Sequence, residues 1–253
     1  MPFSQFRTLF LSTLLGTVAL TAVDARAGTI LSVDLGTANQ SPFVLWNVGA
    51  DGINARTKGF TITDTVSVPS GLLSAIIGAG SDATDVNNDN GSLNTRSRTN
   101  VPPDSGSFTQ SNLLTDRVVS TTGTGLFLSL SGFAPNTTFS IQVWGYDTQN
   151  SNPYGAKPGT FSLYDRTNGA NSLIGSFTSV AGALPTDNNT FSVVGNFTSD
   201  KNGMIILESI SNIDGTGIMN GFVVSTVPEP MGVSLFAGGL AMLALRRRRS
   251  RVS

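Results

Sequence analysis

The chain has 253 residues with no cysteine and no histidine, and its formal net charge is −1. Without these two residue types, a disulfide framework, Ser–His–Asp or Cys–His catalysis and histidine metal sites are all excluded. From residue 28 to residue 227 there are 14 Asp and Glu against eight Lys and Arg. This acidic balance argues against nucleic acid as a partner.

The N-terminus has the layout of a secretory signal peptide. Arg7 precedes an apolar run over 8–23, and Ala25-Arg26-Ala27 has the A-x-A form of a signal peptidase site. We expect residues 1–27 to form a signal helix that signal peptidase removes after Ala27. A retained N-terminal membrane anchor is the alternative.

Residues 28–226 have the composition of a single all-β domain. Gly, Ser, Thr and Asn are abundant while Lys and Glu are scarce, which is poor for helices and typical of strands joined by turns. Short β-rich runs without helices between them predict an antiparallel sandwich of two sheets. Residues 71–79 are predicted to be a short helix or a buried loop. The expected strands are 29–35, 43–48, 59–64, 117–120, 125–130, 139–147, 159–164, 173–178, 191–197, 203–209 and 219–225.

Residues 81–112 differ from the rest of the domain because they contain almost no large apolar side chain. A loop of this length within a compact domain is often functional or mobile. We therefore predict an exposed excursion from the sandwich, which a protease would cut first at Arg96 or Arg98.

The same segment contains a weak candidate for a calcium loop. Asp85, Asn87 and Asp89 alternate as the oxygen ligands of an EF-hand loop do. However, the glycine comes one position late, at Gly91, and the twelfth position is Arg96, which cannot bind a cation. A polar loop without metal is the favoured interpretation. We expect no other cofactor and no catalytic residues.

The strand predicted at 139–147 carries the best candidate for a binding surface. Alternation places Phe139, Ile141 and Val143 on one face, and if that face packs on the core, two aromatic rings stand on the other. An aromatic ring beside amide and carboxylate groups suits a sugar, which has an apolar face and a polar rim. The alternative is that both rings pack beneath a long loop or a neighbouring strand. The candidate ligand-binding residues are Gln142, Trp144, Tyr146 and Asp147.

Several local patterns of this region are similar to those of galactose-binding-like jelly-roll domains. They are Val33-Asp34-Leu35-Gly36 followed by Trp46-Asn47, the strand–turn–strand run 128–139, and the closing Asn220-Gly221-Phe222. The resemblance implies a jelly-roll sandwich over most of 29–225. Many members of that fold bind sugars, whereas others are packing modules.

The C-terminal residues 227–253 have three parts in a fixed order. Pro228, Glu229 and Pro230 interrupt regular structure, and the apolar run 231–245 follows them without a charge. As a helix this run would be roughly 22 Å long, which can span a locally thinned bilayer. A buried C-terminal helix of a soluble domain is the alternative. The basic stop consists of Arg246, Arg247, Arg248 and Arg249, which should stay on the cytoplasmic side.

This order resembles the PEP-CTERM sorting signal of Gram-negative bacteria, in which a Pro-Glu-Pro motif precedes a short transmembrane helix and a basic end. The resemblance implies that an exosortase-type enzyme recognises the motif and removes the tail. The protein would be held in the inner membrane by its C-terminal helix and then released to the cell surface or beyond it. Such proteins are associated with bacteria that make exopolysaccharide.

Two functions of the domain remain open from the sequence. The first is an exported surface or matrix protein without catalytic activity. The second is a carbohydrate-binding module for exopolysaccharide. Exposure of Trp144 and Tyr146 would favour the second function, and their burial would favour the first.

Overall fold

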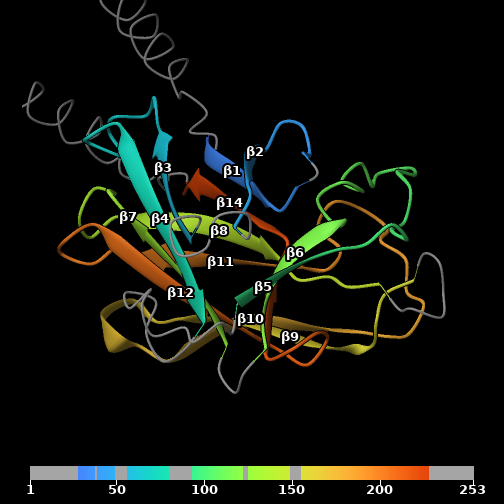
Figure 1. The fold of residues 1–253 in the computed structure, drawn as a ribbon. Coiled ribbons are helices and arrows are strands. Elements are labelled where there is room, and N and C mark those ends of the chain that lie inside the picture. The colour runs from blue at the N-terminus through green and yellow to red at the C-terminus, as the bar shows by residue number, and fades with distance from the viewer. Residues whose placement is uncertain are drawn as a thin grey trace, which may run out of the picture. The chain divides into compact units, whose positions relative to one another are not determined.

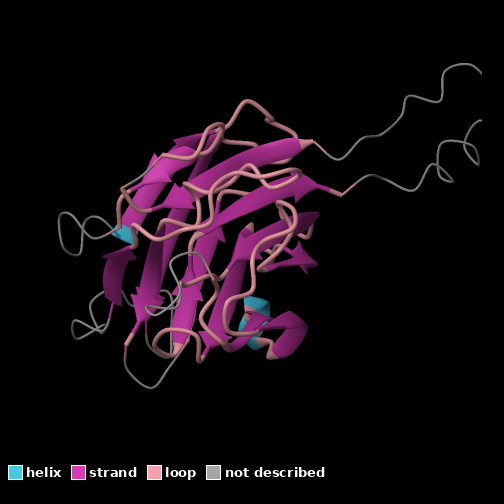
Figure 2. Cartoon of the chain, turned by 90° about the vertical axis from the view of Figure 1, so that its right-hand side faces the viewer, coloured by secondary structure: helices cyan, strands magenta, loops and turns pink. Residues whose placement is uncertain are grey.

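The computed structural model describes residues 28–37, 39–48, 56–79, 93–121, 125–148 and 155–227. These residues are almost entirely strand and loop (Figure 2), with a short 3-10 turn, η2, at Thr167–Gly169. Among them, no helix combines the length and apolar character needed to cross a bilayer. The predicted signal helix, the Pro-Glu-Pro motif with the helix and arginines after it, and the loop with Asp85, Asn87 and Asp89 lie outside the described residues.

Residues Gly28–Val227 form one compact unit that contains two large sheets and one small sheet (Figure 1). The five-stranded sheet has the spatial order β11 (Ser192–Thr198), β8 (Thr138–Trp144), β14 (Gly221–Thr226), β1 (Thr29–Leu35) and β2 (Val44–Trp46). The six-stranded sheet has the order β10 (Ser172–Ser179), β9 (Gly159–Asp165), β12 (Met204–Ser211), β7 (Leu126–Ser131), β4 (Leu72–Ala79) and β3 (Thr57–Thr61). The small sheet has the order β13 (Gly217–Met219), β6 (Asp116–Ser120) and β5 (Leu93–Ser97).

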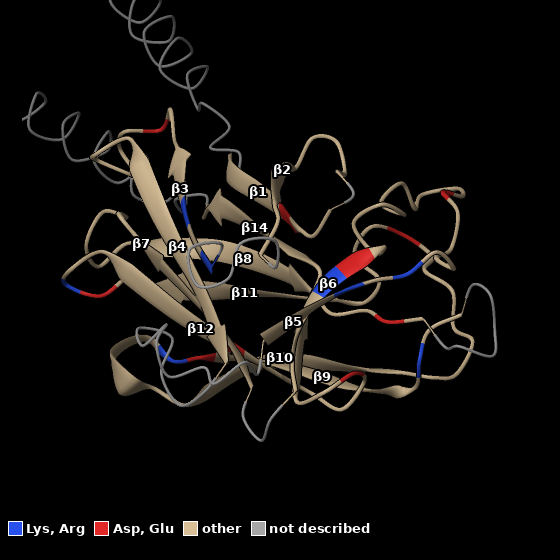
Figure 3. Ribbon diagram, in the orientation of Figure 1, with Lys and Arg blue, Asp and Glu red and all other residues tan. Residues whose placement is uncertain are grey.

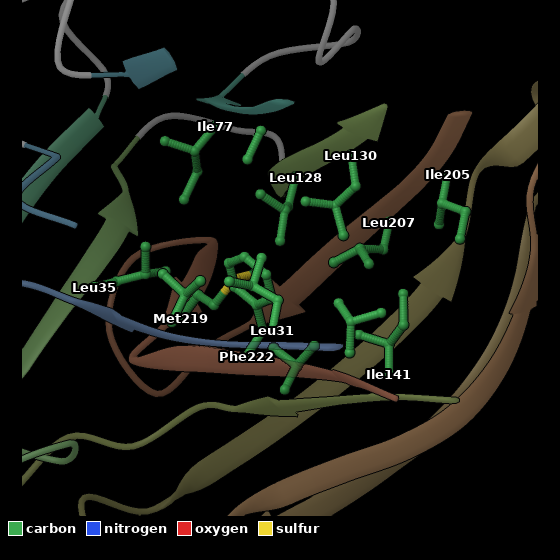
Figure 4. Packing of buried hydrophobic residues seen from close by; sticks show 14 of the residues in the cluster. Leu31, Leu35, Ile77, Leu128, Leu130, Ile141, Ile205, Leu207, Met219 and Phe222 are labelled. Carbon is green, nitrogen blue, oxygen red and sulfur yellow. The ribbon is translucent and has the colours of Figure 1, made fainter. Parts of the chain in front are cut away.

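The main core lies between the two large sheets. Ile141 and Phe222 from the five-stranded sheet meet Leu128 and Leu207 from the six-stranded sheet in one cluster of buried side chains (Figure 4). Alternation along the strands produces this core, because every second side chain points inward. For the described residues, the prediction of an all-β fold built mainly of antiparallel strands is confirmed.

The structure differs from the predicted architecture in three elements. Residues 71–79, predicted as a short helix or a buried loop, contain the whole of strand β4, whose Leu73, Ala75 and Ile77 are fully buried. The pair β1–β2 is parallel, in a sandwich that was predicted to be antiparallel throughout. The small sheet was not predicted, because β5 lies in the polar segment and β13 has only three residues.

The two ends of the unit leave the sandwich at the same place. Strand β14 pairs with β1 in antiparallel register, and the Thr226 N–H donates to the Gly28 carbonyl at 2.9 Å. At the other end of β14, Gly221 lies opposite Trp144, the last residue of β8. In Figure 1, β8 points toward β6. The loops after β8 therefore lie a full strand length away from Gly28 and Val227, the two ends of the unit.

Candidate functional site

The predicted sugar-binding surface at the end of β8 is not exposed. Phe139, Ile141 and Val143 face the core and are fully buried, as alternation predicted. However, Trp144 is only 2% exposed and Tyr146 only 1% exposed, so neither ring can stack on a sugar in this conformation. The prediction of their exposure is wrong, and the alternative of packing beneath a loop is the one that the structure has.

A second hydrophobic cluster encloses both rings. Phe43 meets Trp144 edge to face at 5.9 Å, and Phe191 lies 4.9 Å from the Tyr146 ring. The Trp144 indole N–H donates to the Asn188 carbonyl at 2.9 Å. The full cluster, called here the loop-covered cluster, comprises Phe43, Phe108, Leu113, Leu114, Trp144, Tyr146, Ala156 and Phe191.

The cover over this cluster comes from the segment that was predicted to be an exposed excursion. Residues 103–107 are exposed, but Phe108 is buried and the turn at Ser105 and Phe108 is closed by two backbone hydrogen bonds of 2.9 and 3.0 Å. The prediction of an exposed excursion at 81–112 therefore holds only in part over 93–112: most side chains there are exposed or half-buried, but β5 pairs with β6 and Phe108 is buried. Phe108 is the large apolar residue of this polar segment that packs into the cluster, and hydrogen bonds between Thr109 and Asn188 hold the loop beside it.

The other two candidate residues lie in different environments. Gln142 is partly exposed on the outer face of the five-stranded sheet, where its amide donates to Ser192 Oγ at 2.8 Å and to Asn189 Oδ1 at 3.1 Å. Asp147 is buried and belongs to a network of charged groups. The four predicted residues therefore do not form one surface.

Arg117 is the centre of this charge network. Its side chain is completely buried, and it bridges two carboxylates: its Nη2 lies 2.8 Å from Asp214 Oδ2 and 2.9 Å from Asp147 Oδ1. Its Nε also donates to Asp214, at 3.1 Å. Strand β6 carries both signs of charge (Figure 3), because Asp116 precedes Arg117. A buried charge must be paired to remain ionised, and two carboxylates meet that need.

Three further cations form an outer rim around the same carboxylates. Arg96 Nη1 lies 2.6 Å from Asp214 Oδ1, and Arg98 Nε lies 3.0 Å from Asp147 Oδ1. The Lys157 ammonium stands 3.7 Å from Asp214 and 3.9 Å from Asp147. Arg96 and Arg98 were expected to be the first protease sites, but both side chains are held by these ion pairs.

The groups around Arg117 and Asp214 shift the pKa values of both side chains. Burial lowers the pKa of the Arg117 guanidinium, and the charges of Asp147 and Asp214 oppose that effect. Burial would raise the pKa of Asp214, but the hydrogen bond and charge of Arg117 and the charges of Arg96 and Lys157 outweigh it, so the pKa lies below its usual value. Asp214 is therefore a carboxylate at neutral pH and pairs with the Arg117 guanidinium.

Asn220 ties the charge network to the sandwich. Its side-chain oxygen accepts from the Tyr146 N–H at 2.6 Å, and its amide nitrogen donates to the Asp116 carbonyl at 2.8 Å. The next residue must be glycine, because a Cβ at Gly221 would lie 2.5 Å from the Val33 carbonyl oxygen. The motif Asn220-Gly221-Phe222 thus has a structural role that joins β1, β6 and β8.

Another buried carboxyl, that of Asp34, lies near Asp116 at the end of β1. The Gln40 N–H donates to Asp34 Oδ2 at 2.8 Å, whereas Asp34 Oδ1 has no hydrogen-bond partner among the described residues. Burial raises the Asp34 pKa to about 7, the Gln40 hydrogen bond lowers it, and the charge of Asp116 raises it. Within the described ranges, no group of three or more acidic, His or Cys side chains could hold a metal ion.

Asp34 should make the protein less stable as the pH rises toward neutrality. Its carboxyl has a usual pKa of 3.8 and a folded-state pKa of about 7, so between these values the folded chain binds more protons than the unfolded chain. The free energy of unfolding therefore declines across this window. We expect Asp34→Asn to remove the decline in urea unfolding measured between about pH 4 and pH 8. The lowered pKa of Asp214 acts below pH 3.8 and leaves this window unaffected. Parallel pH profiles of the two proteins would contradict the assignment.

Among known proteins, the chain shows similarity to solved structures. No family model and no curated protein matches the chain. Among solved structures, it is similar to the C-terminal CBM6 of LamC, a marine laminarinase from Zobellia galactanivorans, with 15% identity and a TM-score of 0.26 over 53% of this chain and 89% of that chain. It is also similar to the CBM22-1–GH10 modules of the Clostridium thermocellum endo-1,4-beta-D-xylanase 10B complexed with xylohexaose, with 15% identity and a TM-score of 0.28 over 53% of this chain. The match spans 24% of that second chain. Both neighbours contain carbohydrate-binding modules, but at these TM-scores the likeness does not establish a shared fold.

Proposed function

We propose that the protein is an exported, non-catalytic β-sandwich that is sorted to the cell surface or extracellular matrix by its C-terminal signal. The observation that carries this proposal is the order of Pro228-Glu229-Pro230, the apolar run 231–245 and the arginines 246–249. An apolar segment that ends in clustered arginines suits a membrane stop with a cytoplasmic end. Signal peptidase and an exosortase-type enzyme are the processing partners that this layout requires.

The environment of the aromatic residues favours a structural role for the domain. Trp144 and Tyr146 are enclosed in the loop-covered cluster, so the domain lacks the aromatic surface that was expected to stack on sugars. The absence of histidine and cysteine supports a non-catalytic role. We also propose that the sandwich is a galactose-binding-like jelly roll, on the sequence patterns around Val33-Asp34-Leu35-Gly36 and Asn220-Gly221-Phe222.

Replacing Pro228, Glu229 and Pro230 by alanine should leave the tail attached and the protein in the inner membrane, because the processing enzyme would lose its recognition motif. Mass spectrometry of the C-terminus, together with fractionation of the membranes, measures both effects. Val227→Ala, which changes the residue next to the motif, is the matched control and should be processed normally. Normal tail removal in the triple-alanine variant would overturn the proposed sorting.

A second candidate function is the binding of exopolysaccharide. The observation that favours it is the concentration of cations around Asp147 and Asp214 in a domain that is otherwise acidic. This function is compatible with delivery to the surface, because a matrix protein must contact its matrix.

A further inference from the structure

The cations of the domain are concentrated in the charge network. Of the eight Lys and Arg between residues 28 and 227, four belong to it, whereas only two of the 14 Asp and Glu do. The network therefore carries two positive charges in excess. The remainder of the region holds four cations and 12 acidic residues. Because salt screens charges over about 8 Å, a ligand at the network experiences the local excess rather than the net charge of the domain.

Two cations would be enough to neutralise the two carboxylates, and the rim supplies more than that. The buried Arg117 already bridges Asp147 and Asp214, and each carboxylate has one further arginine. Arg117 Nη1 also has no hydrogen-bond partner among the described residues, but it is buried, so the donors open to a ligand belong to the rim. The network thus has more donors than its own carboxylates can use.

Of the cations in the charge network, Lys157 has the most N–H donors left for a ligand. Its ammonium is 3.7 and 3.9 Å from the two carboxylates, which is beyond hydrogen-bond distance, and its side chain is 41% exposed. Arg96 and Arg98 beside it are 33% and 28% exposed. Within the described part of the chain, Arg96 uses only Nη1 for its hydrogen bond to Asp214. A fork of guanidinium donors next to an ammonium matches the geometry of a carboxylate.

We propose that Arg96, Arg98 and Lys157 bind the carboxylates of an acidic polysaccharide whose charges are separated by neutral sugars. The ligand's charges must be widely spaced because acidic residues outnumber cations on the remainder of the domain. A duplex nucleic acid carries a charge about every 1.7 Å, so its other phosphates would be repelled by the surrounding acidic residues. An anionic membrane would be repelled in the same way. A sparsely charged glycan can place one carboxylate on the rim while its neutral sugars contact the remaining surface. The biological setting rests on the proposed export, but the binding itself can be measured independently of it.

The test uses residues 28–227, which form a compact unit with their own core. The probe is xanthan, a glucuronate-bearing polysaccharide, compared with its carboxyl-reduced derivative by biolayer interferometry. We expect binding to xanthan that weakens as salt is added, and little binding to the reduced form. Lys157→Gln should weaken binding about threefold to tenfold, as for an exposed charge-assisted contact. Lys157→Arg should preserve binding because it keeps the charge.

Lys201→Gln is the matched control, because it removes the same charge from an exposed lysine outside the network. It should leave binding unchanged. Equal binding to xanthan and its reduced form, equal weakening by Lys157→Gln and Lys201→Gln, or tighter binding to duplex DNA or phosphatidylserine vesicles would each overturn the proposal. Tail processing is measured in cells, so failure of the sorting proposal and failure of this one are distinguishable.

Discussion

Replacing Arg117 by methionine should lower the free energy of unfolding by about 3–5 kcal/mol, the usual cost of removing one partner from a buried ion pair. Methionine fills much of the same space but leaves Asp147 and Asp214 buried with only the partly exposed rim cations beside them. Urea unfolding at neutral pH measures the loss. Lys201→Met, at an exposed position, should change stability by no more than about 0.5 kcal/mol.

The origin of this cost can be separated from simple loss of packing. If it comes from uncompensated carboxylates, adding Asp147→Asn and Asp214→Asn to Arg117→Met should restore part of the lost stability, because the buried negative charges are then gone. A triple variant that is less stable than Arg117→Met, or a loss below about 1 kcal/mol for Arg117→Met itself, would show that the network is not a structural centre.

Trp144→Ala should cost about 3–5 kcal/mol, because it removes a large buried side chain and leaves a cavity in the loop-covered cluster. It also leaves the Asn188 carbonyl without the indole donor. Thermal or urea unfolding measures the change. Gln142→Ala, two residues earlier on the same strand and partly exposed, should cost far less because it creates no comparable cavity.

The same substitution distinguishes the two interpretations of strand β8. A Trp144→Ala protein that keeps its stability but loses polysaccharide binding would mean that the ring is exposed in solution. That result would support the hypothesis that Trp144 stacks on a sugar. A large loss of stability supports the enclosed arrangement of the rings against Phe43 and Phe191.

The sequence was informative where burial depends on local alternation. Phe139, Ile141 and Val143 were assigned to the core from periodicity alone, and they are fully buried. Alternation cannot determine whether the opposite face is covered, because Trp144 is enclosed by Phe43, 101 positions earlier, and by Asn188, 44 positions later. The sequence alone therefore left both the exposure and the burial of Trp144 and Tyr146 open, and the structure has them buried.

Strand β4 was missed for a related reason. Its residues Leu72–Ala79 are nearly all apolar, because β4 is an inner strand of the six-stranded sheet, between β3 and β7. A short continuous apolar run does not distinguish a buried strand from a buried helix. Only the pairing of Ile77 with Leu128 and of Ser74 with Ser131 resolves it.

The charge network could not have been assembled from the sequence. Its members come from five separate segments, and Arg96 is 118 positions from Asp214. One signal was available: Arg117 stands in a strand followed by Val118 and Val119, where a cation needs a buried partner. The sequence did not identify Asp147 and Asp214 among the other aspartates as those partners.

The pairing of β14 with β8 determines how the domain would carry a pulling force. A load applied between Val227 and the rim around Asp147 would pull at one end of β14 and on the chain beyond β8. These two points lie at opposite ends of neighbouring antiparallel strands, so the force acts along the strands and shears them. All the hydrogen bonds of the Gly221–Thr226 ladders then bear the load together, rather than opening one after another as in a zipper. A load between these two points would therefore meet the sandwich in its mechanically stronger direction.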